Sequence, residues 1–196
     1  MILYIHGFAS SGLGQKAESL REFCAEQNVH FIAPSLPTIP SLAISTLEHL
    51  IQLFQPFEPV HLMGSSLGGY YGLWLAERFD LKLVLINPAL RPVPLLQAAT
   101  GLVKHHHDGS HFDWTAAHNQ SLAEYEITPS IALQRRCLLL SQQGDEVLNY
   151  QDAVKLLPAA QQIIEPGGNH SFQDFARHHR SILSFLLDEP TDTQTH

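Results

Sequence analysis

Three residues that lie far apart in the chain, Ser66, Asp145 and His170, have the side chains needed for nucleophilic chemistry. A serine hydroxyl is a weak nucleophile at neutral pH, so it needs a base within hydrogen-bond reach and an acid that orients the base. Ser66 is the middle residue of Gly64-Ser65-Ser66-Leu67-Gly68, a G-x-S-x-G box between a strand-like run and a helix-like run. Such a box holds its serine on a sharp, strained turn. We therefore predict that Ser66 is the nucleophile and that Ser65 only packs or forms a local hydrogen bond.

The other two residues follow strand-like runs, as a base and its orienting acid should. Asp145 comes after an apolar run and a glycine, and His170 comes after a second run and Gly167-Gly168-Asn169. Catalytic groups gather at the carboxyl ends of the strands in an open α/β sheet. The order serine, aspartate, histidine is that of the α/β-hydrolase fold. Glu146 is an alternative acid, but we favour Asp145 because the residue after the glycine usually turns inward.

An acyl-transfer site also needs donors for the oxyanion of its tetrahedral intermediate. The backbone N–H of Leu67, directly after the nucleophile, is the first donor that we predict. We assign the second to the N–H of Phe8, in the loop after the first apolar run. In this interpretation His6 braces the loop, and Gly7 lets the backbone pass close to the substrate.

Short apolar runs alternate with amphipathic stretches along the chain, as a parallel sheet covered by helices requires. The fold class that we predict is therefore α/β, a compact α/β-hydrolase fold with a mostly parallel sheet and helices on both faces. Helical spacing marks an early helix through Leu20, a second helix capped at Ser41, and a last helix from Phe175, followed by a mobile polar tail after Leu187. The predicted strands are Ile2–Ile5, His30–Ala33, Val60–Met63, Leu81–Ile86, Cys137–Ser141 and Gln161–Ile164.

One segment interrupts this alternation. From Pro88 to about Arg136 the chain is rich in proline, histidine and mixed polar residues and has no clear strand. Long irregular connections in compact domains are usually binding loops or lids. We predict one α/β-hydrolase domain over residues 1–196, with a cap inserted at about 88–136 after the fourth strand.

Several segments resemble the α/β-hydrolase superfamily and, within it, the short bacterial esterases of the YqiA type. The segments span nearly the whole chain, and the resemblance implies esterase or thioesterase activity on acyl esters, including acyl-CoA, with Ser66, Asp145 and His170 at the catalytic positions. One departure is Gly12, where such proteins often have proline. The similar segments are His6-Gly7-Phe8 with Ser10-Ser11, Gly64 to Tyr71, Asn87-Pro88-Ala89 with Arg91-Pro92, Gly144 to Leu148, and Gly167 to His170.

Composition limits the other classes of function. The net charge of −8 argues against a general nucleic-acid binder, which needs a basic surface. Cys24 and Cys137 lie in apolar contexts that predict buried thiols and no disulfide framework. The sequence has no pattern of a signal peptide or a transmembrane segment, so we expect a cytoplasmic protein without stable membrane insertion. We expect a small-molecule acyl ester or thioester as substrate and no cofactor, and the oligomeric state stays open.

Some polar residues outside the triad allow two interpretations. The run His105-His106-His107 resembles a metal site, but consecutive histidines point in different directions, so we predict a solvated loop and no metal. These imidazoles, charged below about pH 6.5, could instead attract an anionic substrate. Arg91 is a candidate substrate-binding residue or the partner of an acidic cap residue. The glycines between Gly7 and Gly12 have phosphate-loop spacing, but Leu13-Gly14 follows in place of the required lysine and hydroxyl residue.

The leading hypothesis is therefore a carboxylesterase or thioesterase that forms an acyl-enzyme at Ser66. Three alternatives stay open from the sequence. A peptidase or lactonase would use the same triad on other acyl compounds, and a non-catalytic binding protein would have kept the fold alone. A metal-binding protein would depend on the histidine run.

Overall fold

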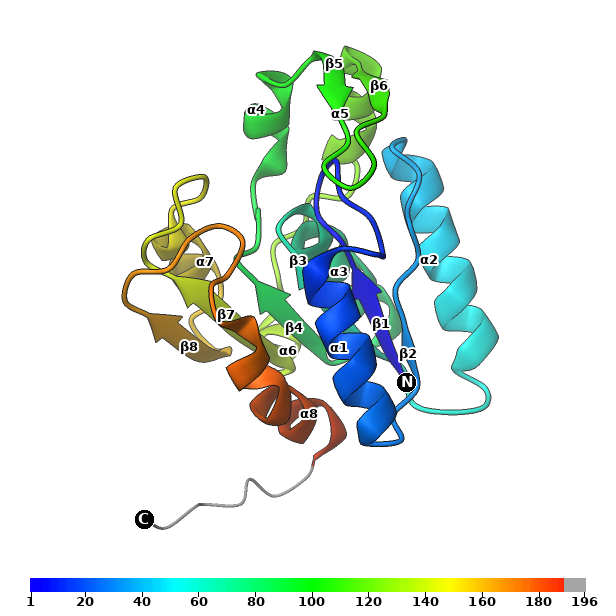
Figure 1. Cartoon of the computed structure of the whole chain (residues 1–196), viewed down its shortest axis with the longest axis vertical. Helices are drawn as coiled ribbons and strands as arrows, with labels where there is room; N and C mark the ends of the chain where they lie inside the picture. The colour runs from blue at the N-terminus through cyan, green and yellow to red at the C-terminus, as the bar shows by residue number, and fades with distance from the viewer. Residues whose placement is uncertain (189–196) are drawn as a thin grey trace.

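A computed structural model describes residues 1–188 and contains a six-stranded sheet in the order β2-β1-β3-β4-β7-β8. Every neighbouring pair of these strands is parallel. Parallel neighbours require crossover connections, and helices supply them (Figure 1). The α/β class and the mostly parallel sheet predicted from the sequence are thereby confirmed. The strands are β1 (Ile2–Ile5), β2 (Phe31–Ile32), β3 (His61–Ser65), β4 (Leu83–Ile86), β7 (Cys137–Gln142) and β8 (Gln161–Glu165).

Helices cover both faces of the sheet, and the strands are apolar on both faces as a result. In β1, Ile2 and Tyr4 belong to one buried cluster, while Leu3 and Ile5 belong to the other. Helices α1 and α8 pack on the first face, and α2 and α3 pack on the second. The helices of the sheet layers are α1 (Gln15–Glu26), α2 (Pro40–Phe54), α3 (Leu67–Phe79), α6 (Ile131–Arg135), α7 (Tyr150–Leu156), the 3-10 helix η1 (Phe175–His178) and α8 (His179–Leu187).

The helix boundaries differ in detail from the sequence expectation. Helix α2 has Ile39 as its N-cap and Pro40 as its first residue, so the predicted cap at Ser41 is wrong. Proline suits the first helical position because its missing N–H has no intrahelical acceptor there. The predicted last helix consists of η1 followed by α8. The predicted mobile tail, apart from Asp188, lies outside the described residues.

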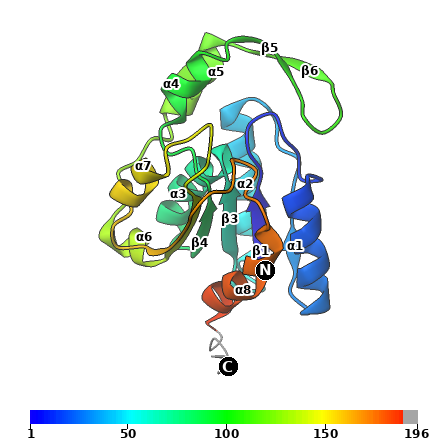
Figure 2. The ribbon, with the colours of Figure 1, turned by 60° about the vertical axis from the view of Figure 1, so that its left-hand side comes forward.

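Four short elements lie above the carboxyl end of the sheet: α4 (Pro92–Gln97), β5 (Gly101–Lys104), β6 (His111–Trp114) and α5 (Ala116–Ala123) (Figure 2). Strands β5 and β6 form an antiparallel hairpin separate from the main sheet. The expectation of an irregular segment without strands was therefore wrong here. The side chains alternate, with Val103, Phe112 and Trp114 facing inward and Leu102 and Asp113 facing outward. This pattern covers only a few residues, and the histidines within the hairpin mask it. The assignment of residues 1–196 to one domain with a cap at 88–136 stays a prediction.

Two further expectations can be compared with the described part of the chain. Cys24 and Cys137 are free and buried. Among residues 1–188, no helix is both long and apolar enough to cross a membrane.

Candidate active site

The turn between β3 and α3 holds Ser66 in a strained conformation. Its backbone has φ 53° and ψ −120°, which a residue with a side chain rarely adopts. Two hydrogen bonds to the strand β4 and its following loop hold this turn: the N–H of Ser66 donates to Ile86, and its carbonyl accepts from Ala89. Gly68 lets the helix start close to β1, because a Cβ there would lie 2.0 Å from the Ile5 carbonyl oxygen. The neighbouring hydroxyl of Ser65 is buried and bonds to Tyr4, as expected of a packing residue.

Ser66, His170 and Asp145 form one continuous chain of hydrogen bonds. The Nε2 atom of His170 lies 3.1 Å from the Ser66 Oγ atom. On the other side of the ring, Nδ1 lies 2.8 Å and 3.0 Å from the two carboxylate oxygens of Asp145. An Nδ1–H that donates to the carboxylate leaves Nε2 free to accept the serine proton. The three side chains predicted from the sequence thus meet in the order that the chemistry needs.

The two acidic residues after β7 have different contacts. The Asp145 side chain is only 2% exposed, and its Oδ1 atom accepts the backbone N–H groups of Val147 and Leu148, each at 2.9 Å. Glu146 is exposed and accepts the backbone N–H of His170 at 3.0 Å, away from the ring. Backbone N–H groups of Glu146 itself and of His170 hold the pKa of the Glu146 carboxyl below its usual value. Asp145 is therefore the carboxylate that can orient the imidazole.

Two buried amide side chains, Asn87 and Gln142, hold the loop that carries His170. Asn87 is 3% exposed, and its Nδ2 atom donates to the carbonyls of Asn169 at 2.9 Å and His170 at 3.2 Å. Its Oδ1 atom accepts the backbone N–H of Gln142 at 3.0 Å. The Oε1 atom of Gln142 in turn accepts the N–H groups of Asn169 and Gln173. Asn87 has φ 40°, which asparagine tolerates better than most residues.

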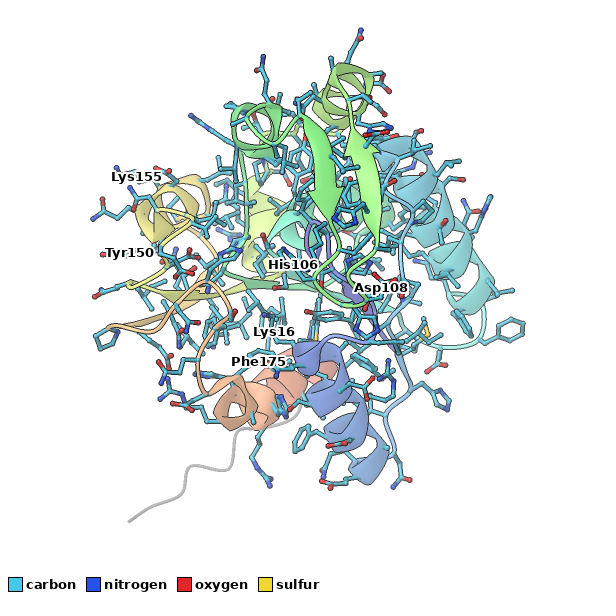
Figure 3. The ribbon with its side chains drawn as sticks, turned by 45° about the horizontal axis from the view of Figure 1, so that its top comes forward. Lys16, His106, Asp108, Tyr150, Lys155 and Phe175 are labelled. Atoms are coloured by element: carbon cyan, nitrogen blue, oxygen red, sulfur yellow. The ribbon has the colours of Figure 1, made fainter. Side chains whose placement is uncertain are left out.

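Lys16, at the start of helix α1, holds the same loop from another direction. Its Nζ atom donates to the carbonyl of Ser171, the residue after His170, at 2.8 Å. Figure 3 labels Lys16 near Phe175, where α1 meets the segment that follows the histidine loop. Burial lowers the pKa of the Lys16 ammonium group. No role was predicted from the sequence for Asn87, Gln142 or Lys16. Only their positions, directly after β4, at the end of β7 and at the start of α1, could have drawn attention to them.

The predicted oxyanion donors lie next to the nucleophile. Leu67 is the first residue of α3, so its N–H has no acceptor within the helix. The loop with Phe8 approaches Ser66 closely, because a Cβ on Gly7 would lie 3.1 Å from the Ser66 Cβ atom and 3.7 Å from its Oγ atom. Within residues 1–188, neither the Phe8 N–H nor the Leu67 N–H has a hydrogen-bond acceptor. Both groups are therefore free to donate to a substrate.

His6 has the bracing contacts expected of it. Its Nδ1 atom lies 2.8 Å from the Gly7 carbonyl oxygen, and its Nε2 atom accepts the backbone N–H of Leu36 at 2.9 Å. The ring thus joins the loop after β1 to the segment after β2. Burial lowers the pKa of the His6 imidazole, the hydrogen bond to Gly7 opposes this, and nearby His105 lowers it further. Gly12 also belongs to this loop, and a Cβ there would lie 2.0 Å from the Ala33 carbonyl oxygen, so a glycine fits the local packing.

A pocket opens beside the predicted oxyanion donors, under the β5–β6 hairpin. It has about 360 Å³ of empty space, including the part that is open to solvent. Most of its wall is apolar and aromatic, with Phe8 and Tyr71 from the sheet layers and Phe112 and Trp114 from the hairpin. Tyr71 is buried in the core and also lines this pocket. Tyr70 stays in the core, where its hydroxyl donates to the Leu122 carbonyl.

The remaining candidate residues do not line this pocket, with one exception. Arg91 is exposed at the start of α4, and its guanidinium makes no ion pair with any residue in 1–188. In the histidine run, His105 lines the pocket and its ring packs on Phe112, with the centroids 4.8 Å apart. His106 and Asp108, labelled in Figure 3, lie exposed at the turn of the hairpin. Over the described residues, no group of three or more histidine, cysteine, aspartate or glutamate side chains could hold a metal ion.

The fold belongs to a known class, because solved α/β-hydrolases have the same architecture. Mouse alpha/beta hydrolase domain-containing protein 10 aligns with a TM-score of 0.70 and 20% identity over 96% of this chain and 89% of its own. A monoacylglycerol lipase from Paleococcus ferrophilus aligns with a TM-score of 0.72 and 14% identity over 96% and 94% of the two chains. At these identities the similarity establishes the α/β-hydrolase fold.

Sequence comparison identifies the family. The profile of the uncharacterised protein family UPF0227 matches residues 1–187, so the chain belongs to this family. A curated relative, the UPF0227 protein YcfP of Escherichia coli O9:H4 (strain HS), is 24% identical over 190 residues, which cover 94% of this chain and 98% of the relative. The solved structures described above support the α/β-hydrolase fold that the sequence resemblance implied.

Proposed function

We propose that this protein is a serine hydrolase that cleaves carboxylic acyl esters or thioesters through an acyl-enzyme at Ser66. The observation that carries the proposal is the unbroken chain of hydrogen bonds from the Ser66 hydroxyl through His170 to the buried Asp145 carboxylate. A serine that serves only as a helix start does not need a strained backbone, a base 3.1 Å away and two free N–H groups beside it. The fold of hydrolases, lipases and esterases adds support to this function.

In this mechanism His170 takes the hydroxyl proton through Nε2 while the Ser66 Oγ atom bonds to the acyl carbon. The carbonyl oxygen becomes an oxyanion and accepts hydrogen bonds from the N–H groups of Phe8 and Leu67. Asp145 stabilises the imidazolium that forms. When the tetrahedral intermediate collapses, the imidazolium gives its proton to the leaving alcohol or thiol. Water then attacks the acyl-enzyme with His170 again as the base, and the serine hydroxyl is restored as the acid leaves.

The test uses the wild-type protein and Ser66→Ala with a series of acyl esters and acyl-CoA thioesters. We expect Ser66-dependent turnover and rapid covalent labelling of the wild type by a fluorophosphonate, which reacts with activated serines. Replacement of the nucleophile should lower kcat by roughly a million-fold, by analogy with serine proteases that lose the serine of their triad. Equal turnover by both proteins would overturn the proposal.

The same measurements separate the alternatives left open by the sequence. A non-catalytic binding protein would show neither labelling nor turnover. A peptidase or lactonase would be labelled at Ser66 but would hydrolyse amides or lactones faster than simple esters. Matched oxygen and sulfur esters of one acyl group decide between esterase and thioesterase activity, because only the leaving group differs between them.

A further inference from the structure

The pocket under the hairpin lies on one particular side of the nucleophile. Its wall includes Gly7, Phe8 and Leu67, the residues beside the Ser66 hydroxyl and the proposed oxyanion donors. None of the described residues that line it comes from the loops carrying Asp145 and His170. The leaving group must stay within reach of the His170 ring to receive its proton. With the carbonyl oxygen at the N–H groups, the side that faces this pocket is left for the acyl substituent.

The hairpin presents an apolar face to this pocket because its side chains alternate. Val103 is paired with Phe112, and Gly101 is paired with Trp114. Paired residues lie on the same face of a hairpin, so the side chains of Val103, Phe112 and Trp114 share the inner face. Leu102 and Asp113 form the pair between them, and both are exposed. Side chains one residue apart in a strand point to opposite faces. The hairpin therefore lines the pocket with one face and meets solvent with the other.

Contacts with the loop after β1 fix the inner face of the hairpin. The Phe8 ring packs edge-on against both Phe112 and Trp114, with centroid distances of 5.7 Å and 5.0 Å. Trp114 is 1% exposed, and its Nε1 atom lies 3.3 Å from the Asn119 Oδ1 atom. The main chain is joined as well, because the N–H of His106 donates to the Ala9 carbonyl at 2.8 Å. The wall of the pocket and the loop of the proposed oxyanion donor are thus one packed unit.

We propose that this pocket binds the acyl group of the substrate and that Phe112 and Trp114 limit that group to a short chain or another compact apolar shape. The inference rests on the esterase function proposed above. The pocket has about 360 Å³ of empty space, and part of this is open to solvent, so the space enclosed beside the nucleophile is smaller than that figure. Rings from the hairpin take up the space that a longer chain would need.

The test measures kcat/KM for 4-nitrophenyl esters with acyl groups from acetyl to dodecanoyl, in the wild type, Phe112→Ala and Leu102→Ala. The wild type should prefer the short acyl groups. Phe112→Ala should raise kcat/KM for octanoyl relative to butanoyl by about tenfold or more, because each newly buried methylene is worth roughly a fourfold factor. Leu102→Ala is the matched control: it removes an apolar side chain from the outer face of the same hairpin, where Leu102 is 71% exposed, and should leave the ratio unchanged.

A second series, butanoate esters of alcohols of increasing length, separates the acyl side from the leaving-group side. The inference is overturned if the wild type prefers dodecanoyl esters, if Phe112→Ala leaves the acyl preference unchanged, or if its effect falls on the alcohol series instead. Two controls exclude misfolding as the cause of an altered preference. Phe112→Leu is a milder change at the same position, and each variant should be labelled by the fluorophosphonate at the wild-type rate. Absence of Ser66-dependent turnover on every ester would instead remove the proposed function itself, so the two failures are distinguishable.

Discussion

Asn87 offers a direct test of how His170, the proposed catalytic base, is held, because the change Asn87→Asp alters one hydrogen-bonding atom and almost no shape. The substituted side chain keeps an oxygen that can accept the Gln142 N–H, and aspartate, like asparagine, tolerates the positive φ of 40°. The donor to the Asn169 and His170 carbonyls is lost, and a carboxylate oxygen replaces it about 3 Å from them. Asn87 touches no substrate in the proposed mechanism, so it acts as a positioning residue.

The size of the effect follows from the lost bonds. A buried polar group left without its partner costs about 1–3 kcal/mol, and each 1.36 kcal/mol is a tenfold change in rate. If the loop escapes this cost by moving His170, kcat should fall about 10- to 100-fold. KM should change little, because the described pocket wall contains no residue of this loop. Steady-state kinetics with 4-nitrophenyl butanoate and the rate of fluorophosphonate labelling measure both quantities.

Asn28→Asp is the matched control, since Asn28 also has a positive φ, 56°, but lies exposed after α1 at the opposite end of the molecule. It should keep full activity. The reasoning is refuted if Asn87→Asp retains the wild-type kcat while folded, or if its loss falls on KM with kcat intact.

Three further predictions concern the triad, the turn between β3 and α3, and the effect of pH on stability. Asp145→Asn should lower kcat by about 10⁴-fold, whereas Glu146→Gln, which removes a charge outside the ring's reach, should cost less than about tenfold; comparable kcat values for the two would contradict the assignment. Gly68→Ala should destabilise the fold by about 3 kcal/mol or more in urea unfolding, because its Cβ would lie 2.0 Å from the Ile5 carbonyl oxygen, while Gly14→Ala, with its nearest contact at 3.5 Å, should cost far less. Burial, then the positive N-terminus and Lys82, lower the pKa of His61 from 6.5 to about 4. The unfolded chain therefore binds this proton more tightly, and stability should fall as pH drops from about 6.5 towards 4. The full shift corresponds to about 2 kcal/mol between pH 7 and 5, which we reduce to about 1 kcal/mol because the ring is partly exposed. His61→Leu should lose less stability than the wild type over this range, and parallel curves would show that His61 does not contribute.

The sequence predicted the sheet well because fully buried parallel strands are continuous apolar runs. All six predicted runs overlap a strand, and the largest boundary differences are at β3, which ends at Ser65 and not at Met63, and at β4, which begins at Leu83 and not at Leu81. The meeting of Ser66, Asp145 and His170 followed from their place at the ends of such strands. The roles of these residues stay a prediction until activity is measured.

Other features were not accessible from the sequence, for physical reasons. The hairpin was missed because each of its strands has four residues, too few for alternation to stand out. The supports of the histidine loop were missed because Asn87 and Gln142 lie 55 residues apart and meet only through parallel pairing of β4 with β7. The pocket role of Tyr71 depended on where the hairpin comes to rest above α3, which no local pattern specifies.

The attachment of the hairpin through the main chain of His106 leaves its turn open to redesign. Any residue except proline supplies the N–H that reaches Ala9, so the exposed side chains of His106 and His107 can be exchanged without releasing that anchor. Exchanges at these two positions could therefore change the charge at the approach to the proposed active site, while the aromatic wall beneath stays where it is.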